Sequence, residues 1–232
     1  MDLKIKDVAS LLNVSETTIR RWVSHGKMPA YRLNHQYRFS RSEIENWVMD
    51  QKLSKDKEQV VFQDLTQAEN IKTGSQQYSL YRAVYKGGVY HNVPGANKEQ
   101  VIRNTMQLVT KRFELDADVI SELLLDRERL MPTALNNGLA VPHTRDFLLK
   151  EHFDAIVVVF PEKEIEYGAL DGKAVHTMFF LFACEDKRHL HLLAKLAHLS
   201  SKEQIQELFK RKPDEKKLLE VIKNWESQNP LT

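Results

Sequence analysis

The hydrophobic and polar positions of the first fifty residues follow a helical period twice. Residues 5–12 predict a short helix, residues 13–15 supply a turn, and Ser15 can cap a second helix over residues 16–24. That second helix is expected to end near Gly26. Two short helices joined by three or four residues are typical of a helix-turn-helix.

The pattern then changes to alternation. Residues 30–33 and 37–39 predict two strands around a tip at residues 34–36, which indicates a hairpin or wing. Residues 40–43 resemble a capping signal for a helix that continues through Trp47. We therefore expect a mostly α winged helix-turn-helix domain over residues 1–52.

A polar stretch follows, and a longer unit comes after it. We interpret residues 53–77 as a linker and residues 78–228 as the second domain. In this second domain, helical patterns occupy residues 98–113, 116–127, 187–199, 202–209 and 213–225, and strand-like runs occupy residues 139–141, 155–160 and 175–184. Helices mixed with a few strands predict an α/β fold with a central mixed sheet flanked by helices.

Composition narrows the class of protein. The chain has 42% hydrophobic residues and one cysteine, Cys184, so it has material for ordinary cores but no disulfide framework. The N-terminus lacks the apolar segment of a signal peptide, and the longest apolar run, residues 178–184, is too short to span a bilayer. We expect a soluble, cytoplasmic protein without a membrane partner.

Charge is distributed unevenly along the chain. Residues 4–41 carry eight Lys/Arg and two acidic residues, a net charge of +6, whereas the remainder carries −4. A local positive charge of this kind favours phosphate binding. A basic three-helix unit can also be a protein-docking module, but the charge distribution favours double-stranded DNA.

The predicted DNA-contacting side chains fall into two groups. Hydroxyls and guanidiniums in the first half of a recognition helix suit base edges and phosphates. Positive groups on a wing add affinity and salt dependence. The predicted residues are Thr17, Thr18, Arg20 and Arg21 on the second helix, and Lys27, Arg32, His35 and Arg38 around the hairpin.

A family resemblance supports this interpretation. Residues 7–15, 18–22, 26–30 and 37–39 look like the excisionase and MerR-type winged helix-turn-helix, and the similarity extends over residues 3–49. Such domains often have Gly at the hairpin tip, where this chain has Asn34-His35. Because Asn tolerates a left-handed conformation, the turn remains feasible.

The segment of residues 131–145 is the most informative part of the second domain. Asn136-Asn137-Gly138 predicts a tight turn, and Pro142 forces the preceding residue into an extended conformation. His143 is thereby presented at the end of a short buried strand. A neutral imidazole attacks phosphorus at pH 7 without a general base. From spacing alone, an ordinary loop histidine is an equal alternative.

Three signatures in order resemble the mannitol/fructose/nitrogen class of IIA proteins of the bacterial phosphotransferase system. They are residues 127–130, 138–143 and 189–193, and the similarity covers about residues 79–228. The resemblance implies that His143 accepts a phosphoryl group from a histidine phosphocarrier protein, with Arg127 and His189 as the supporting residues. The family commonly has Gly where this chain has Thr144, a departure that concerns the loop geometry more than the phosphorylation.

Helical periodicity agrees with the choice of His189. On a helix starting after Asp186, His189 falls on the apolar face with Leu192, Leu193 and Leu196. His191, Lys195 and His198 fall on the opposite side and are expected to be solvated. A zinc site of His189, His191 and His198 is disfavoured because residues i and i+2 of a helix point apart and no cysteine is near. We expect no metal and no cofactor.

The sequence therefore predicts a bacterial regulator that binds DNA and is phosphorylated on a histidine. Two alternatives stay open. One is a phosphoryl carrier, in the transferase class of enzymes, that passes phosphate to a sugar-permease IIB domain; the chain itself has no IIB-like segment. The other is a regulator that docks partner proteins according to its phosphorylation state. A protein reading a two-fold DNA site is expected to be a homodimer.

Overall fold

The computed structural model describes residues 2–12, 14–33, 36–53, 78–144, 146 and 154–229. Its first part contains β1 (Asp2–Lys4), α1 (Ile5–Leu12), α2 (Glu16–Ser24), β2 (Tyr31–Leu33), β3 (Gln36–Ser40) and α3 (Arg41–Leu53). The three strands form an antiparallel sheet in the order β1-β3-β2. The N-terminal unit is thus a helix-turn-helix with a small sheet, as the sequence predicts.

Both helices of the helix-turn-helix begin and end at the predicted residues. Ser15 caps α2 by accepting a hydrogen bond from the Thr18 backbone N–H at 3.1 Å. The domain core includes Ile19 and Phe39, both fully buried, and the Trp22 and Trp47 rings, whose centroids lie 5.4 Å apart. Local capping and periodicity therefore determine this part of the fold.

Two elements of this unit differ from the sequence prediction. β1 was not expected, because its three residues become a strand only by pairing with β3. α3 continues past Trp47 to Leu53, because Val48 and Met49 are buried in a hydrophobic cluster that also contains residues of the second part of the chain.

The second part of the chain holds a five-stranded mixed sheet in the order β4-β7-β8-β6-β5. Its strands are β4 (Val89–Val93), β5 (Ala134–Leu135), β6 (Leu139–Ala140), β7 (Ala155–Pro161) and β8 (Thr177–Phe182). β7 and β8 are antiparallel, whereas β4 runs parallel to β7 and β6 parallel to β8. The mixed central sheet agrees with the predicted α/β class.

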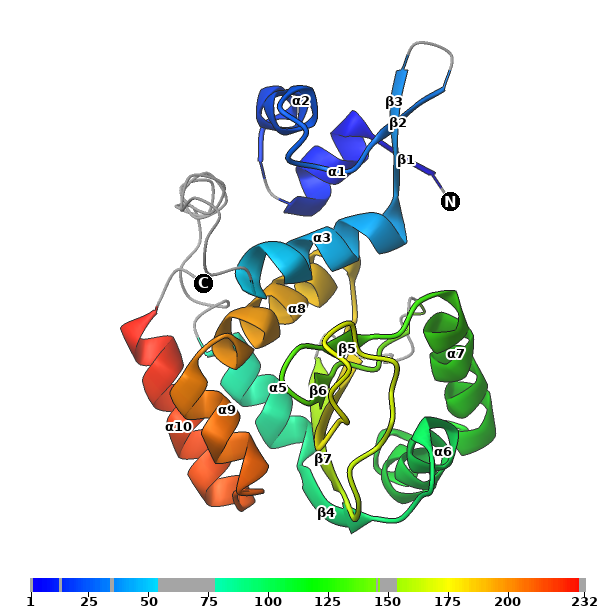
Figure 1. Ribbon diagram of the computed structural model, residues 1–232, viewed down its shortest axis with the longest axis vertical. Coiled ribbons are helices and arrows are strands. Elements are labelled where there is room, and N and C mark those ends of the chain that lie inside the picture. Colours follow the sequence, from blue (N-terminus) through cyan, green and yellow to red (C-terminus); the bar gives the residue numbers. More distant parts are fainter. Residues whose placement is uncertain are drawn as a thin grey trace.

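Helices cover both faces of this sheet (Figure 1). α6 (Lys98–Val109) and α7 (Ala117–Leu130) pack on Val157, Val159 and Phe180. The other face, with Val158 and Phe179, packs against α5 (Ser79–Gly87), α8 (Asp186–Ser200), α9 (Glu203–Lys210) and α10 (Glu215–Gln228). Because the central strands are buried on both sides, they appear in the sequence as continuous apolar runs.

Several short elements were not predicted from the sequence. α5, β4 and β5 gave no sufficient local signal, and the expected helix over residues 98–113 divides into α6 and a 3-10 turn, η1 (Thr110–Phe113). α5 depends on a tertiary contact: a Cβ on Gly87 would lie 2.0 Å from the Ile156 carbonyl oxygen. Glycine therefore permits the close approach of α5 to β7.

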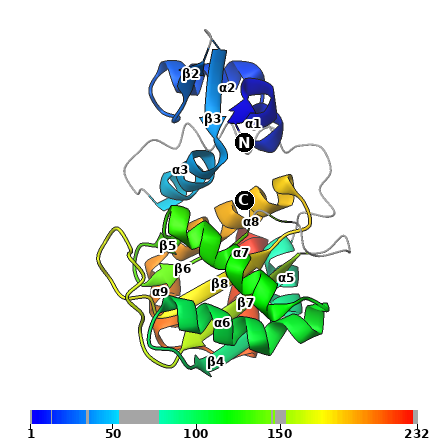
Figure 2. The same ribbon diagram turned by 90° about the vertical axis from the view of Figure 1, so that its right-hand side faces the viewer.

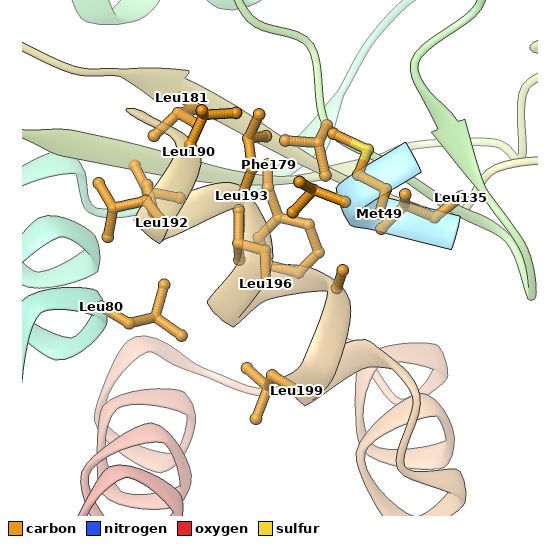
Figure 3. Packing of buried hydrophobic residues seen from close by; sticks show 14 of the residues in the cluster. Met49, Leu80, Leu135, Phe179, Leu181, Leu190, Leu192, Leu193, Leu196 and Leu199 are labelled. Carbon is orange, nitrogen blue, oxygen red and sulfur yellow. The ribbon is translucent and has the colours of Figure 1, made fainter. Parts of the chain in front are cut away.

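The helix-turn-helix unit rests on the second domain through α3, which lies along α8 (Figures 1 and 2). Figure 3 shows Met49 of α3 beside Leu135 of β5, within the cluster that contains Phe179, Leu190 and Leu193. α2 and the β2–β3 hairpin lie at the end farthest from the sheet (Figures 1 and 2). The contact thus uses α3, with α1 also touching α8, and leaves the recognition helix α2 outside it.

No helix in the described ranges is long and apolar enough to cross a membrane.

Candidate functional site

The geometry of β6 and β8 determines where His143 lies. The chain leaves β6 alongside β8, and the Leu181 backbone N–H donates to the Pro142 carbonyl at 3.0 Å. The side chain of His143 is fully buried. Its Nδ1 lies 2.8 Å from the Val141 carbonyl oxygen. Because a carbonyl can only accept, Nδ1 is the protonated nitrogen and Nε2 has the lone pair in the neutral ring.

His189 approaches His143 from the first turn of α8. The two ring centroids are 5.0 Å apart, and His189 is 1% exposed. Burial, together with the positive charges of His143, Arg41 and Arg127, lowers the pKa of His189 to about 3. Its Nε2 has no hydrogen-bond partner within the described residues. His189 is therefore neutral at pH 7 and can offer a ring nitrogen to a bound anion.

Arg127 comes from the last turn of α7 and is 3% exposed. It donates from one terminal nitrogen to the Met131 carbonyl at 2.9 Å. The neighbouring Glu128 accepts hydrogen bonds from the backbone and hydroxyl of Thr133 and so fixes the segment leading to β5. The structure thus brings His143, His189 and Arg127 into one region of the fold, and their roles stay predictions.

A fourth residue, Glu45 of α3, is part of this site and was not predicted. It is fully buried, and its Oε2 lies 3.6 Å from His143 Nε2 and 3.9 Å from a terminal nitrogen of Arg127. Its Oε1 accepts from Arg41 Nε at 3.0 Å. The sequence offered one weak signal for its burial. Glu45 directly follows Ile44 and lies two residues before Trp47, and both of these residues are buried.

The cationic surroundings determine the charge of Glu45. Burial alone would raise its pKa, but the adjacent His143 imidazole, 3.6 Å away, together with the Arg41 guanidinium holds the pKa well below its usual value. Glu45 is therefore a carboxylate in a site made of imidazole and guanidinium groups.

Glu45, His143 and His189 each offer one ligand atom, and these atoms lie within 4.8 Å of one another. Such a group could hold a divalent metal ion. However, the guanidiniums of Arg41 and Arg127 lie at the same carboxylate and disfavour a further cation. The arrangement suits an anion better than a metal.

The other histidines of α8 contact different elements. His191 Nε2 lies 3.1 Å from the Ser79 hydroxyl of α5, and the His198 ring lies 5.3 Å from the Trp225 ring of α10. The expectation that Lys195 is solvated was wrong: it is 2% exposed and pairs with Glu226 at 2.7 Å. α10 packs on this side of α8, so the helix has two buried faces.

The predicted DNA-contacting residues occupy the far end of the N-terminal unit. Thr17, Arg20, Arg21 and Arg32 are exposed, whereas Thr18, Lys27 and Arg38 are half-buried. The Thr18 hydroxyl lies 2.9 Å from that of Ser15, so it contributes to the helix cap.

Two arginines of the hairpin have internal partners. The Arg32 guanidinium lies 5.0 Å from the centroid of the Tyr37 ring. Arg38 donates to the Gln36 side chain at 3.0 Å. His35 lies outside the described residues.

The lowered pKa of His189 predicts a pH-dependent stability. The unfolded residue binds a proton below about pH 6.5, whereas the folded residue stays neutral down to about pH 3. The unfolded state therefore binds more protons in this window, and the unfolding free energy falls as the pH falls, by up to about 1.4 kcal/mol per pH unit.

Urea unfolding at pH 7.0, 6.0 and 5.0 measures this dependence in a range where most carboxylates stay ionised. The same series on His189→Gln should have a shallower slope, because glutamine does not titrate. Equal slopes for the two proteins would contradict the assignment of a neutral, buried His189.

The fold and the site define the class to which the chain belongs: a mixed-sheet α/β domain with a buried histidine pair and arginine, joined to a helix-turn-helix. The second part of the chain belongs to the EIIA 2 family of the phosphoenolpyruvate-dependent sugar phosphotransferase system, which it matches over residues 84–225. Residues 3–52 match a helix-turn-helix domain family of the excisionase type.

Individual relatives match one part of the chain or the other. The nitrogen regulatory protein of Pseudomonas aeruginosa is 30% identical over 134 residues, which are 56% of this chain and 86% of that protein. The transcriptional repressor DcmR of Methylorubrum extorquens is 52% identical over 44 residues, 18% of this chain and 17% of the repressor.

A solved structure shows the same fold in the second domain. The nitrogen regulatory protein IIA-Ntr of Neisseria meningitidis has a TM-score of 0.54 at 24% identity, covering 59% of this chain and 94% of that one.

Proposed function

We propose that this chain is a bacterial DNA-binding regulator that is phosphorylated on Nε2 of His143 by a histidine phosphocarrier protein. The observation that carries the proposal is the orientation of His143. Its Nδ1 donates to a backbone carbonyl, so the lone pair of Nε2 is directed to the side where Arg127 and His189 lie. The family membership of the domain supports this assignment.

The chemistry needs positioning and charge stabilisation. A transferring phosphoryl group spreads negative charge over three oxygens. Arg127 can donate to these oxygens, and neutral His189 can donate one further hydrogen bond from a ring nitrogen. Arg127 is held by the Met131 carbonyl and His189 by the first turn of α8, so both donors are positioned by their own domain, which favours exchange between two histidines.

The DNA-binding half of the proposal rests on the helix-turn-helix and on its charge. The positively charged residues cluster on this unit, and Arg20 and Arg21 of α2 are exposed on the recognition helix. A homodimer that reads a two-fold site stays a prediction.

One experiment tests both halves. The full chain is incubated with phosphoenolpyruvate, the general phosphotransferase enzyme and the histidine phosphocarrier, and the labelled peptide is identified by mass spectrometry. Unmodified and phosphorylated protein are then titrated against duplexes selected from a random double-stranded library, at two salt concentrations. We expect label on His143 and a different DNA affinity for the two forms. Absence of label, or identical DNA binding, would contradict the proposal.

A second candidate is a phosphoryl carrier. A fructose-specific EIIABC component of Bacillus subtilis is 27% identical over 134 residues, 56% of this chain and 21% of that protein. If phosphate moves from labelled chain to a purified IIB domain faster than it is lost to water, the carrier function is favoured.

A further inference from the structure

Glu45 places a negative charge of the DNA-binding unit directly at the predicted phosphorylation site. α3 is the third helix of the helix-turn-helix, yet the Glu45 carboxylate lies between His143 Nε2 and Arg127 of the other domain. We infer that Glu45 occupies the position of the phosphoryl group, so that docking of the helix-turn-helix domain and phosphorylation of His143 exclude each other. This inference rests on the proposed function.

The distances leave no room for both groups. Glu45 Oε2 is 3.6 Å from His143 Nε2, and both side chains are fully buried. A phosphorus atom bonded to Nε2 would lie closer to that nitrogen than the carboxylate oxygen does, and its three oxygens would overlap the carboxylate. The phosphorylated histidine therefore requires Glu45 to leave.

The charges lead to the same conclusion. A phosphoryl group brings a charge of about −1.5 to −2 at pH 7. Glu45 is itself ionised, because its cationic neighbours hold its pKa well below the usual value. In the unmodified protein the carboxylate lies beside the His143 ring and the guanidiniums of Arg41 and Arg127, whereas in the phosphorylated protein two anions would share one buried site.

The rest of the interface shows how Glu45 is held in place. Arg41 of α3 donates to Glu45 and also bonds Asp186 at the start of α8. Asn46 lies 2.7 Å from the Met131 sulfur, and Met49 is buried in the shared hydrophobic cluster. The helix α3 therefore covers His143 with polar contacts on one side and apolar contacts on the other.

If Glu45 moves away from His143, the whole DNA-binding unit must move away from the second domain with it. Ile44 and Trp47 of α3 belong to the core of the helix-turn-helix together with Trp22, so α3 cannot move away alone without exposing that core. A phosphocarrier that reaches His143 must displace this unit, and a phosphorylated His143 keeps it displaced. Phosphorylation is thereby converted into release of the DNA-binding domain.

Phosphoryl transfer to His143 exchanges one N–P bond for another. The lone pair of His143 Nε2 forms the new N–P bond as the donor's N–P bond breaks. The electron pair of the broken bond stays on the donor nitrogen. Each ring keeps the proton on its other nitrogen, and in His143 this is the Nδ1 proton that binds Val141. No other reactant is needed.

The first test compares labelling rates from the phosphorylated phosphocarrier for three full-length proteins: wild type, Glu45→Gln and Glu43→Gln. Glu43 is exposed on the same helix and serves as the matched control. We expect Glu45→Gln to accept phosphate at least tenfold faster than the other two. Equal rates in all three proteins would overturn the inference while leaving the proposed function standing. Absence of label on His143 in all three would overturn the proposed function, and the inference with it.

A second test locks the domains together. Asn46→Cys and Met131→Cys are combined in a Cys184→Ser background and joined by a short bismaleimide with a reducible spacer, because the Asn46 and Met131 side chains are in contact. We expect the crosslinked protein to lose labelling, and cleavage of the spacer by reductant to restore it. Prephosphorylated protein should fail to crosslink. Labelling of the crosslinked protein at the rate of the reduced protein would overturn the inference, as would failure of the unmodified protein to crosslink.

Discussion

Replacing His143 with alanine is expected to abolish phosphoryl acceptance from the histidine phosphocarrier. Among the described residues, His143 is the fully buried histidine whose Nδ1 is held by a carbonyl and whose ring packs against a second buried histidine. Alanine removes the nitrogen that is proposed to accept the phosphoryl group, so acid-labile label should fall to the background. His189→Ala should retain the label but accept it about 10² to 10³ times more slowly, the cost of removing one donor that stabilises the transition-state charge.

Quench-flow labelling with phosphocarrier in excess measures both rates, and circular dichroism establishes that each variant is folded. His191→Ala is the matched control, because His191 lies on the same helix but contacts Ser79 of α5 instead of His143. Its rate should equal that of wild type. Label retained by His143→Ala would show that another histidine is the acceptor and would end the proposed role of this site.

The combined substitution Arg20→Ala and Arg21→Ala is expected to remove most of the DNA affinity. Both side chains are exposed on α2, which lies at the end of the molecule opposite the sheet. If each contacts a base edge or a phosphate, each contributes about 1–3 kcal/mol. Two lost phosphate contacts would also reduce the slope of log affinity against log salt by about 2.

Fluorescence anisotropy on a selected duplex measures both the DNA affinity and its salt dependence. Titrations at about 50 and about 200 mM salt are far enough apart to resolve the slope. Lys216→Ala is the control, because it removes an exposed positive charge from α10 on the second domain. Its slope should match that of wild type. An unchanged slope in the double variant would exclude α2 as the recognition helix and would favour the alternative that the basic unit docks on proteins.

Prediction from sequence succeeded where the determining interactions are local. α1 and α2 begin and end at the predicted residues because a helical period and the Ser15 cap lie within the segment itself. β7 and β8 were visible as apolar runs because both of their faces are buried. Helical periodicity also chose His189 over His191 correctly as the histidine that lies beside His143.

Prediction failed where a second element decided the outcome. The period of α8 placed Lys195 on a solvated face, but α10 covers that face and supplies Glu226 as a buried partner. α5 and β4 have little pattern of their own, and they form because they pack on β7 or pair with it. Short elements of this kind depend on contacts that no window of sequence contains.

The sequence by itself determined two domains, a positively charged helix-turn-helix and a histidine presented after Pro142, because capping, periodicity and the restriction imposed by proline act over a few residues. Only the tertiary structure decided what covers that histidine. Glu45 and His143 belong to different domains, with residues 53–77 between them, and no periodic or spacing rule connects the two positions. The packing of α3 on α8 brings the carboxylate to the imidazole, and it makes the DNA-binding unit part of the site on which phosphorylation is expected to act.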